Sequence, residues 1–203
     1  FTGRFVDPSI DLYLRLRKIA HAPMMAFFDW PEVKILSASP ERFFKIENNV
    51  ITTTPIKGTI KRGSTDEEDE QNKLALLSSE KDRAELLMVT DMMRNDIGRV
   101  CEIGSVRVDN LFGLHTFSHY HHLISDITGR LKLNTTLADI FCALFPGGSI
   151  TGAPKIAVMQ HIDELEHRAR GIYTGAVGYI TNAGVVDFNI PIRTITIEGD
   201  RLS

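Results

Sequence analysis

The sequence predicts an α+β fold, with antiparallel strands in meanders and helices inserted between them. Short strand-like segments follow one another over residues 24–53, with turn residues between them. A capping pattern, Ser79-Glu80-Lys81-Asp82, then opens a long helical segment. Further short strand patterns return after residue 172, and neither a repeat nor a low-complexity segment interrupts the series.

The composition is that of an ordinary globular chain, because 43% of the 203 residues are hydrophobic and 24% are charged. That length suits one large domain or two small ones, with enough apolar residues for a core. We expect a single domain over residues 1–203. The formal net charge of −3 gives no electrostatic reason to expect nucleic acid or a membrane as a partner. Two cysteines without a Cys-x-x-Cys pair fit a reducing compartment, and no apolar segment has the length of a membrane span. We therefore expect a cytoplasmic protein.

The first quarter of the chain is predicted to form a short helix followed by an antiparallel meander. Apolar residues stand among basic ones in segment 11–19, as in a short helix. The turn residues Asp29-Trp30-Pro31 and Asn48-Asn49 separate the strands that follow. The predicted strands are 24–28, 34–39, 42–46 and 50–53, and the last one leads into a bend at residues 54–59.

The rest of the chain adds further helices and strands. A solvated helix start is expected in the acidic run 66–70, because negative side chains favour a helix N-terminus. The predicted helices are 79–98, 137–144 with Asn134 or Thr135 as its cap, and 154–166. The predicted strands are 106–108, 114–117, 123–127, 172–181, 185–190 and 195–198.

Both ends of the chain look cut. The sequence begins on Phe1 and enters an amphipathic segment at once. At the other end, the Gly199-Asp200 turn opens a hairpin whose second strand has barely begun. We therefore expect the 203 residues to belong to a longer polypeptide.

Lys57 is predicted to lie on a tight bend. Pro55 fixes its own backbone and favours an extended Thr54, while Gly58 can adopt dihedral angles that other residues avoid. A lysine held in this way can act as a nucleophile if its surroundings remove its proton, because the free side chain has a pKa of about 10.4. On these residues alone, an exposed turn lysine is the favoured interpretation.

Carboxylate and imidazole groups supply further candidates. Asp82 and Glu85 lie three residues apart, so both side chains share one face of the predicted helix. They could bind a metal ion, although a salt-bridged surface is the favoured local interpretation. His119 and His121 would face one side of a strand and His122 the other, so a single functional histidine is favoured over a zinc cluster.

Phe145 to Lys155 form a glycine-rich loop that leads into a helix. The loop lacks the Lys-Ser/Thr pair of a Walker A motif and the spacing of a nucleophile elbow. Its free backbone N–H groups could bind an anionic ligand, or the loop could be a plain tight turn. Arg193 stands between apolar neighbours and could bind a carboxylate of a ligand or pair with an internal acid.

Eight short motifs stand in a fixed order along the chain. They are Ser39-Pro40-Glu41, Pro55-Ile56-Lys57-Gly58-Thr59, Asp82-Arg83-Ala84-Glu85, residues 94–100, His122-Leu123-Ile124-Ser125, residues 145–155, Gly175-Ala176-Val177-Gly178-Tyr179 and Ile192-Arg193-Thr194. In this order the sequence, from about Ala22 onward, resembles the chorismate-utilising enzymes. That family includes anthranilate synthase component I, aminodeoxychorismate synthase component I, and the isochorismate and salicylate synthases. The resemblance implies antiparallel β-sheets packed as a sandwich with flanking helices, here incomplete.

The motif around Lys57 distinguishes members of this family. Anthranilate synthases carry alanine at the position of Lys57, whereas the lysine resembles aminodeoxychorismate synthase component I. That resemblance implies amination of chorismate at C4, for p-aminobenzoate and folate synthesis, with ammonia supplied by a glutaminase subunit. Lys57 would attack C2 with loss of the C4 hydroxyl, and ammonia would then add at C4 and expel the lysine.

The resemblance also implies roles for other residues. Glu41 matches the general acid/base for the C4 hydroxyl, and His122 matches a histidine near the reacting ring. Glu85 matches a Mg²⁺ ligand, with Asp82 acting nearby or through water, and the ion would neutralise the ring carboxylate of chorismate. The implied substrate-binding residues are Thr59, Thr151, Gly152, Tyr173 and Arg193.

The sequence departs from the family pattern at its ends. It stops before the glycine-rich strand and glutamate-bearing helix that follow the Ile-Arg-Thr strand in the family, and the N-terminal half is missing too. We therefore expect an incomplete metal site. The alternatives to C4 amination are an anthranilate, isochorismate or salicylate synthase, a binding or glutaminase-docking module without turnover, and a Schiff-base lysine enzyme.

Overall fold

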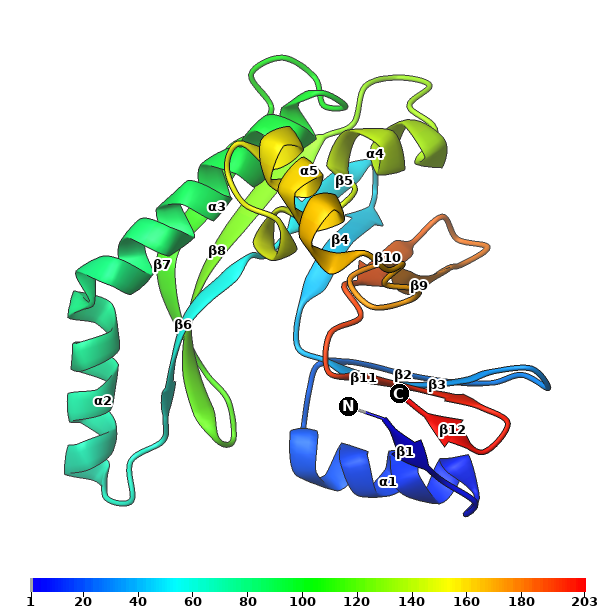
Figure 1. Cartoon of the computed structure of the whole chain (residues 1–203). Coiled ribbons are helices and arrows are strands. Elements are labelled where there is room, and N and C mark those ends of the chain that lie inside the picture. Colours follow the sequence, from blue (N-terminus) through cyan, green and yellow to red (C-terminus); the bar gives the residue numbers. More distant parts are fainter. Residues whose placement is uncertain (1) are drawn as a thin grey trace.

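The computed structural model describes residues 2–203 and contains two antiparallel sheets with five α-helices around them (Figure 1). The predicted α+β class is confirmed. In chain order the elements are β1 (Gly3–Arg4), α1 (Ser9–Ala20), β2 (Met24–Asp29), β3 (Lys34–Ser39), β4 (Arg42–Glu47), β5 (Val50–Thr53), β6 (Ile56–Lys61), α2 (Asp66–Ser78), α3 (Glu80–Gly98), β7 (Arg107–Thr116), β8 (Tyr120–Arg130), α4 (Leu137–Leu144), a 3₁₀ turn η1 (Gly148–Ile150), α5 (Lys155–Glu166), β9 (Val177–Ile180), β10 (Val186–Asn189), β11 (Thr194–Glu198) and β12 (Arg201–Leu202). No helix in residues 2–203 is long and apolar enough to cross a membrane.

The strands divide into a small and a large sheet. The small, five-stranded sheet has the order β1-β12-β11-β3-β2, and α1 lies against its β2 and β3 (Figure 1). The large, seven-stranded sheet runs β6-β8-β5-β4-β10-β9, with β7 also paired to β8. The short strand β12 forms a hairpin with β11 and also pairs with β1. The second strand of this hairpin therefore has a partner on both sides.

The predicted meander over residues 24–53 is wrong in one respect, because its strands belong to two sheets. The chain leaves the small sheet after β3 and enters the large one at β4. It returns between β10 and β11, and the two crossover segments bind each other. The N–H of Ile190 donates to the carbonyl of Glu41 at 3.1 Å, and the N–H of Ala38 donates to that of Arg193 at 3.0 Å. The hydroxyl of Ser39 adds a bond of 2.5 Å to the carbonyl of Ile190.

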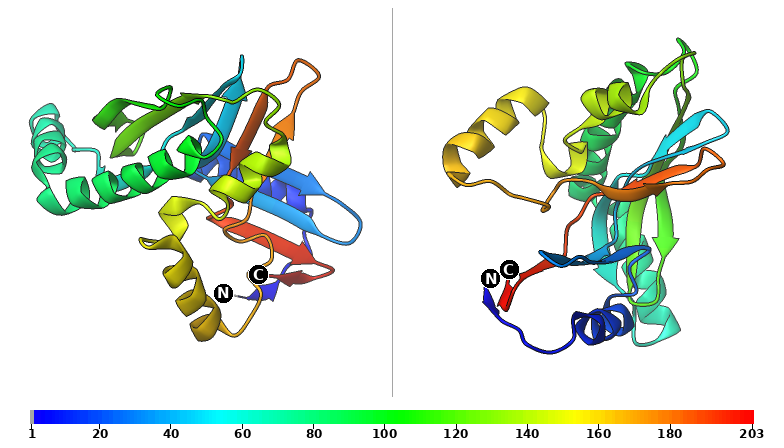
Figure 2. Two further views of the ribbon diagram at one scale, coloured as in Figure 1. Left: turned by 90° about the horizontal axis from the view of Figure 1, so that it is seen from above. Right: turned by 90° about the vertical axis from the view of Figure 1, so that its right-hand side faces the viewer.

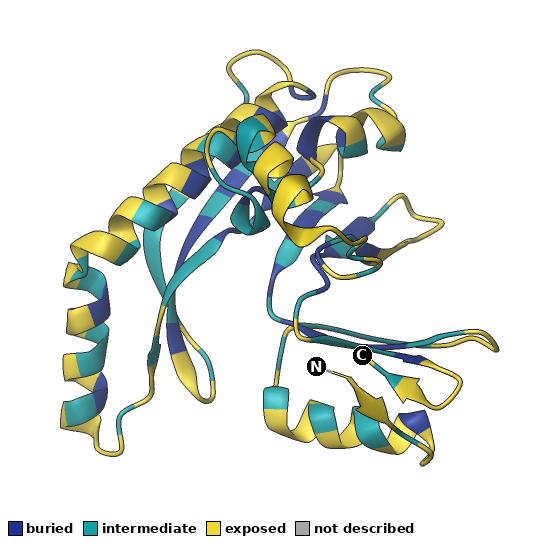
Figure 3. Ribbon diagram, viewed as in Figure 1, coloured by how far each residue is buried: buried dark blue, intermediate teal, exposed yellow. Residues whose placement is uncertain are grey.

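The main core lies between the large sheet and the helices α3 and α4. Phe44 is fully buried and packs against Phe141 and Phe188, with ring centroids 5.4 Å and 5.5 Å apart. Figure 3 shows the buried residues of this core on the large sheet and on the inward faces of α3 and α4, and further buried residues on β3 of the small sheet. Helix α5 has no buried residue and stands away from the sheets (Figure 2). The core therefore fixes α3 firmly, while α5 and the segments beside it form an open edge.

The structure confirms one predicted helix cap and corrects another. Ser79 caps α3 as predicted, because its hydroxyl accepts from the N–H of Asp82 at 3.3 Å. The cap of α4 is Thr136 rather than Asn134 or Thr135, and its hydroxyl and the Asp139 carboxylate complete a capping box. All three residues from 134 to 136 can form caps, so the pattern alone did not fix the first turn.

Replacing Thr136 by alanine is expected to lower the free energy of unfolding by about 1 kcal/mol, because the N–H of Asp139 loses its acceptor. Urea unfolding of the purified chain measures this loss. Thr136→Ser is the matched control, since serine caps as well as threonine. Equal midpoints for the alanine and serine variants would contradict the assignment of the cap.

Two predicted strands also change in extent. The predicted strands 106–108 and 114–117 merge into one irregular strand, β7, which covers Arg107–Thr116. Its pairing with β8 shifts twice, between Val108 and Asn110 and between Asn110 and Gly113. Segment 172–181 is a strand only over β9, because residues 171–175 form turns. In that segment Thr174 and Gly171 have positive φ angles, which a strand does not allow.

Candidate active site

Glu41 lies on the first of the two crossover segments. Its side chain is buried, and its N–H donates to the hydroxyl of Ser39 at 3.2 Å. One carboxylate oxygen, Oε1, is buried without a hydrogen-bond partner. Burial raises the pKa of Glu41, against the smaller lowering effects of the Ser149 hydroxyl and the Lys57 charge. The fold therefore holds a carboxyl group that keeps its proton to an unusually high pH.

Lys57 lies on β6, next to a bulge that Gly58 makes possible. The pairing of β6 with β8 shifts between Lys57 and Thr59, and Gly58 has a φ of 74°. A β-carbon at Gly58 would lie 2.9 Å from the Cβ of Asp82, so only glycine lets the strand approach the start of α3 so closely. Lys57 is half-buried, in contrast to an exposed turn lysine.

Ser149 connects the lysine with the acid. The Nζ of Lys57 donates to the carbonyl oxygen of Ser149 at 3.3 Å. The Oγ of Ser149 is buried, as is Oε1 of Glu41, and neither completes a hydrogen bond of regular geometry although the two side chains are neighbours. Two buried polar atoms without partners mark a place where a polar ligand group can bind. The sequence prediction missed Ser149, whose only signal was its place between Gly148 and Thr151 in the glycine-rich loop.

Asp82 and Glu85 lie along α3 on the side that faces this group. Asp82 packs at Gly58, and Met92, further along the same stripe, lies against Gly148. Glu85 lies on α3 between Asp82, which packs at Gly58, and Met92, which lies against Gly148. Its carboxylate is partly exposed and lies 3.7 Å from the Nζ of Lys81.

The two carboxylates are the candidate ligands of a metal ion. Among residues 2–203 no three His, Cys, Asp or Glu side chains lie close enough together to hold a metal ion. Mg²⁺, however, often takes one or two carboxylates from a protein and completes its shell with water and with anionic groups of the substrate. Asp82 accepts a hydrogen bond of 2.5 Å from the Ser79 hydroxyl, so Glu85 is the freer of the two carboxylates. The residues present fit such an ion as a partial set of oxygen ligands.

His122 lies on β8, with Thr59 of β6 as its neighbour. Its Nδ1 is 2.8 Å from the Oγ1 of Thr59. Burial lowers the pKa of His122, and the positive charge of Arg193 contributes to this, so the ring is neutral at physiological pH. His122 and Arg193 line a small cavity of about 30 Å³ at the crossover from β3 to β4.

The bulge at Gly58 places His122 and Lys57 on opposite faces of the sheet. Lys57 pairs with Leu123, which packs against α2 and α3, whereas His122 pairs with Thr59. His121 confirms the alternation, because it is fully buried and its Nε2 lies 2.9 Å from Asp69 of α2. His122 and Arg193 therefore lie together, and so do Lys57 and Glu41. Among residues 2–203, no hydrogen bond joins one pair directly to the other.

Thr151 and Tyr173 line a wider pocket beside α5. It has a volume of about 450 Å³ and lies between α5, the glycine-rich loop and the turn at residues 171–175. The guanidinium of Arg170 lies 5.6 Å from the ring centre of Tyr173 and is itself bound by Glu166. Gly152 packs on Val158 at the start of α5, where a β-carbon would have its nearest neighbour at 3.3 Å. The loop thus brings Ser149, which was not predicted, to the lysine and the predicted residue Thr151 to this pocket.

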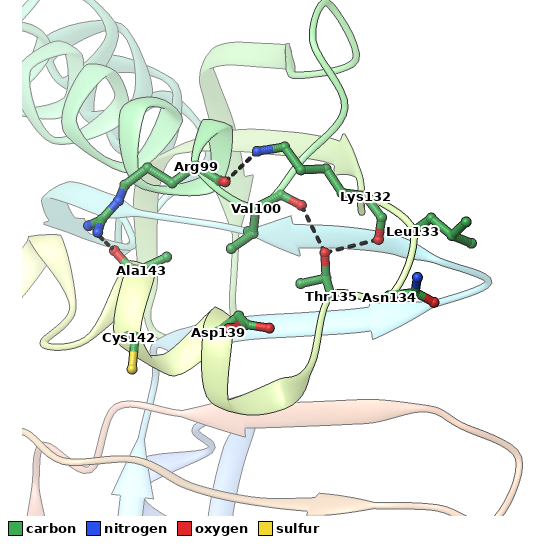
Figure 4. Close-up of a pocket in the computed structure, with 9 residues that line it drawn as sticks. All are labelled: Arg99, Val100, Lys132, Leu133, Asn134, Thr135, Asp139, Cys142 and Ala143. Carbon is green, nitrogen blue, oxygen red and sulfur yellow. Dashed lines mark hydrogen bonds between the residues drawn. The ribbon is translucent and has the colours of Figure 1, made fainter.

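A third hollow lies at the far end of α3 (Figure 4). It also measures about 450 Å³, and its polar groups largely satisfy one another. The Nζ of Lys132 donates to the carbonyl of Arg99 at 2.7 Å, and Arg99 donates to that of Ala143 at 3.3 Å. None of the predicted site residues lines this hollow.

The family described as chorismate binding enzyme matches residues 1–203. This chain belongs to that family. Among curated chorismate-binding enzymes, aminodeoxychorismate synthase component 1 of Salmonella typhimurium is 49% identical over 202 residues, which are 100% of this chain and 44% of that protein. Anthranilate synthase component 1 of Aquifex aeolicus is 45% identical over 194 residues, 96% of this chain and 39% of that protein.

The fold of this chorismate-binding chain is also found in solved structures. The crystal structure of anthranilate synthase component I from Streptococcus pneumoniae matches it with a TM-score of 0.90 and 37% identity, covering 100% of this chain and 44% of that one. The resemblance inferred from the eight motifs is thereby confirmed. The chain spans less than half of the length of these relatives.

Proposed function

We propose that this chain forms part of the active site of an enzyme that aminates chorismate at C4, giving 4-amino-4-deoxychorismate for p-aminobenzoate and folate synthesis. A glutaminase subunit would supply the ammonia. The observation that carries the proposal is the position of a half-buried lysine, Lys57, beside a buried carboxyl group of raised pKa, Glu41, with Ser149 touching both. A nucleophilic amine and a proton donor at one place are what a substitution with a poor leaving group requires.

The reaction would proceed in two displacements. In the first, the Nζ lone pair of Lys57 forms a bond to C2, the ring double bonds shift, and the C4–O bond breaks. Glu41 donates its proton to the departing hydroxyl, which leaves as water. In the second, ammonia forms a bond to C4, the double bonds shift back, and the C2–Nζ bond breaks. The new ammonium group returns a proton to Glu41, so that one water leaves and one ammonia enters without oxidation or reduction.

Other residues of the chain would hold the substrate and a metal ion. The family is generally Mg²⁺-dependent, and we assign the ion to Glu85 with Asp82 in support. When bound, Mg²⁺ would neutralise a carboxylate of chorismate. Arg193 and Tyr173, which line separate cavities in this structure, would have to come together on the enolpyruvyl carboxylate. Thr151 and Gly152 would line the substrate, and His122 with Thr59 would lie near the ring. The substrate would have to reach from the Lys57 side to the pocket at Thr151 and Tyr173.

The product of the full-length enzyme tests this assignment. Incubation with chorismate, Mg²⁺ and an ammonium salt is expected to yield 4-amino-4-deoxychorismate, identified by chromatography and mass spectrometry. Anthranilate, which results from amination at C2, would overturn it.

Amination at C2 is the second candidate, because an anthranilate synthase component 1 matches this chain almost as well as an aminodeoxychorismate synthase component 1 does. The lysine at position 57 supports C4, since anthranilate synthases resemble this chain here but carry alanine. With alanine there is no side-chain amine to attack C2, and ammonia can take that position directly.

The raised pKa of Glu41 predicts an alkaline decline in rate. Glu41 donates a proton, so the rate should fall as pH rises through its raised pKa and deprotonates it. Rates compared at a constant concentration of free ammonia remove the titration of the second substrate. Glu41→Gln should be much slower and should lack this decline. A profile of identical shape in both proteins would show that Glu41 is not the proton donor.

A further inference from the structure

Lys155 closes the glycine-rich loop on itself. Its Nζ donates three hydrogen bonds, to Asp96 Oδ2 at 2.5 Å, to the carbonyl of Pro146 at 2.9 Å and to that of Leu144 at 3.1 Å. An ammonium group has three protons to donate, so the group is fully used. Leu144 ends α4 and Lys155 begins α5, so the bonds tie the two ends of the connecting loop together.

The same lysine fixes this loop to α3. Asp96 lies near the end of α3, and the side chains of Asp96 and Lys155 are 12% and 15% exposed. Met92 and Met93 of α3 fill the space against Gly148, where a β-carbon would come within 2.8 Å of Met92. The loop is therefore held at its ends by Lys155 and pressed at its middle against the helix that carries Asp82 and Glu85.

The closed loop is what presents Ser149 to Lys57. The carbonyl of Ser149 accepts from Lys57 at 3.3 Å, and Thr151 bonds back to the carbonyls of Gly147 and Gly148 at 3.2 Å and 3.3 Å. A shift of the loop ends would move the Ser149 carbonyl away from the lysine. A displacement of about 1 Å at a reacting group can cost about a hundredfold in rate.

We propose that Lys155 is a positioning residue of the reaction, which, anchored by Asp96, holds the loop that sets Ser149 against Lys57 and Glu41. This inference rests on the proposed function in that Lys57 is the nucleophile whose place is being set. A buried ion pair is weak grounds for stability on its own, since well-packed apolar residues often replace one without loss. Lys155 also donates hydrogen bonds to two loop carbonyls, which an apolar pair could not do. These bonds give Lys155 its role in positioning the loop.

The test uses the full-length enzyme with the double variant Asp96→Asn/Lys155→Met. It removes both charges together, so no unpaired charge stays buried and folding is preserved, but the ties to Leu144 and Pro146 are lost. Arg62→Met is the matched control, because it breaks the ion pair of 2.7 Å with the buried Asp69 at α2, remote from the loop. Circular dichroism establishes that all variants are folded at the assay temperature.

Two readouts are compared. For the double variant, kcat for chorismate is expected to fall about tenfold or more with a smaller change in KM, while Arg62→Met stays within about twofold of wild type. Independently of turnover, Lys57 should react with acetic anhydride about threefold faster or more in the double variant, because the Ser149 carbonyl no longer holds its Nζ. Mass spectrometry of the peptide measures this acetylation, with the exposed Lys61 as internal reference.

The labelling rate decides the inference. An unchanged rate of Lys57 acetylation in a folded double variant would overturn it, as would a kcat no lower than that of Arg62→Met. A failure of the proposed function would be seen in a separate measurement, namely which amine the wild-type enzyme produces. That result does not affect the comparison of labelling rates.

Discussion

Lys57→Ala in the full-length enzyme is expected to reduce the rate of C4 amination at least about a thousandfold, the usual scale for loss of a covalent nucleophile. The physical reason is that ammonia alone then has to displace the hydroxyl at C4. The intermediate in which Lys57 is bound at C2 and the C4 hydroxyl has already left does not form. The variant should stay folded, because the side chain makes one hydrogen bond, at 3.3 Å to Ser149, and contributes little to the core. Chromatographic assay of 4-amino-4-deoxychorismate measures the loss.

Lys61→Ala is the matched control, since this exposed lysine ends the same strand and should leave the rate unchanged. The variant Lys57→Ala should also reveal any residual amination at C2 as anthranilate. Turnover within about threefold of wild type would exclude a covalent role for Lys57.

Lys155→Met alone is expected to lower the free energy of unfolding by about 3–5 kcal/mol, because it leaves the Asp96 carboxylate without its cation in a site that is 12% exposed. Urea unfolding of single and double variants measures the effect. Adding Asp96→Asn should recover much of the loss, since the amide carries no charge to desolvate. A single variant as stable as wild type would mean that water or a neighbouring cation reaches Asp96.

The loss of unfolding free energy caused by Lys155→Met should depend on pH. Burial already raises the pKa of Asp96, and Lys155 opposes that effect, so the variant should have a higher folded pKa still. A carboxyl group whose pKa is higher in the folded state favours folding while protonated and loses that contribution as pH rises. The difference between variant and wild type should therefore be small below an ordinary aspartate pKa of about 3.9 and should grow toward neutral pH. A difference that is constant from acidic to neutral pH would contradict this.

Local chemistry explains which elements the sequence could predict. The turn at Asn48-Asn49 depends on two residues that tolerate left-handed angles, and both have positive φ, 51° and 62°. The start of α3 depends on Ser79 and the residue three positions later, and it is found there. The cap of α4 was ambiguous because three capping residues stand in a row, and only packing of the first turn selects Thr136.

Long-range pairing explains what the sequence could not provide. The change of sheet after β3 depends on segment 190–193, about 150 positions further along, so the local strand pattern gives no sign of it. The same holds within the candidate site. Lys57 and Glu41 could be proposed from motifs, but the carbonyl that binds the lysine belongs to Ser149, on a loop between two helices. Lys155 stood in a motif without a role, because its partner Asp96 lies on another helix.

The bonds between the two crossover segments have a consequence for the order in which the site forms. Glu41 sits on the segment before β4, yet its carbonyl and the nearby Ser39 hydroxyl bind Ile190, about 150 positions further along the chain. Contacts between such distant residues form late in folding, since they close a long loop of the chain. We therefore expect Glu41 to reach its buried position only after β10 and β11 have docked.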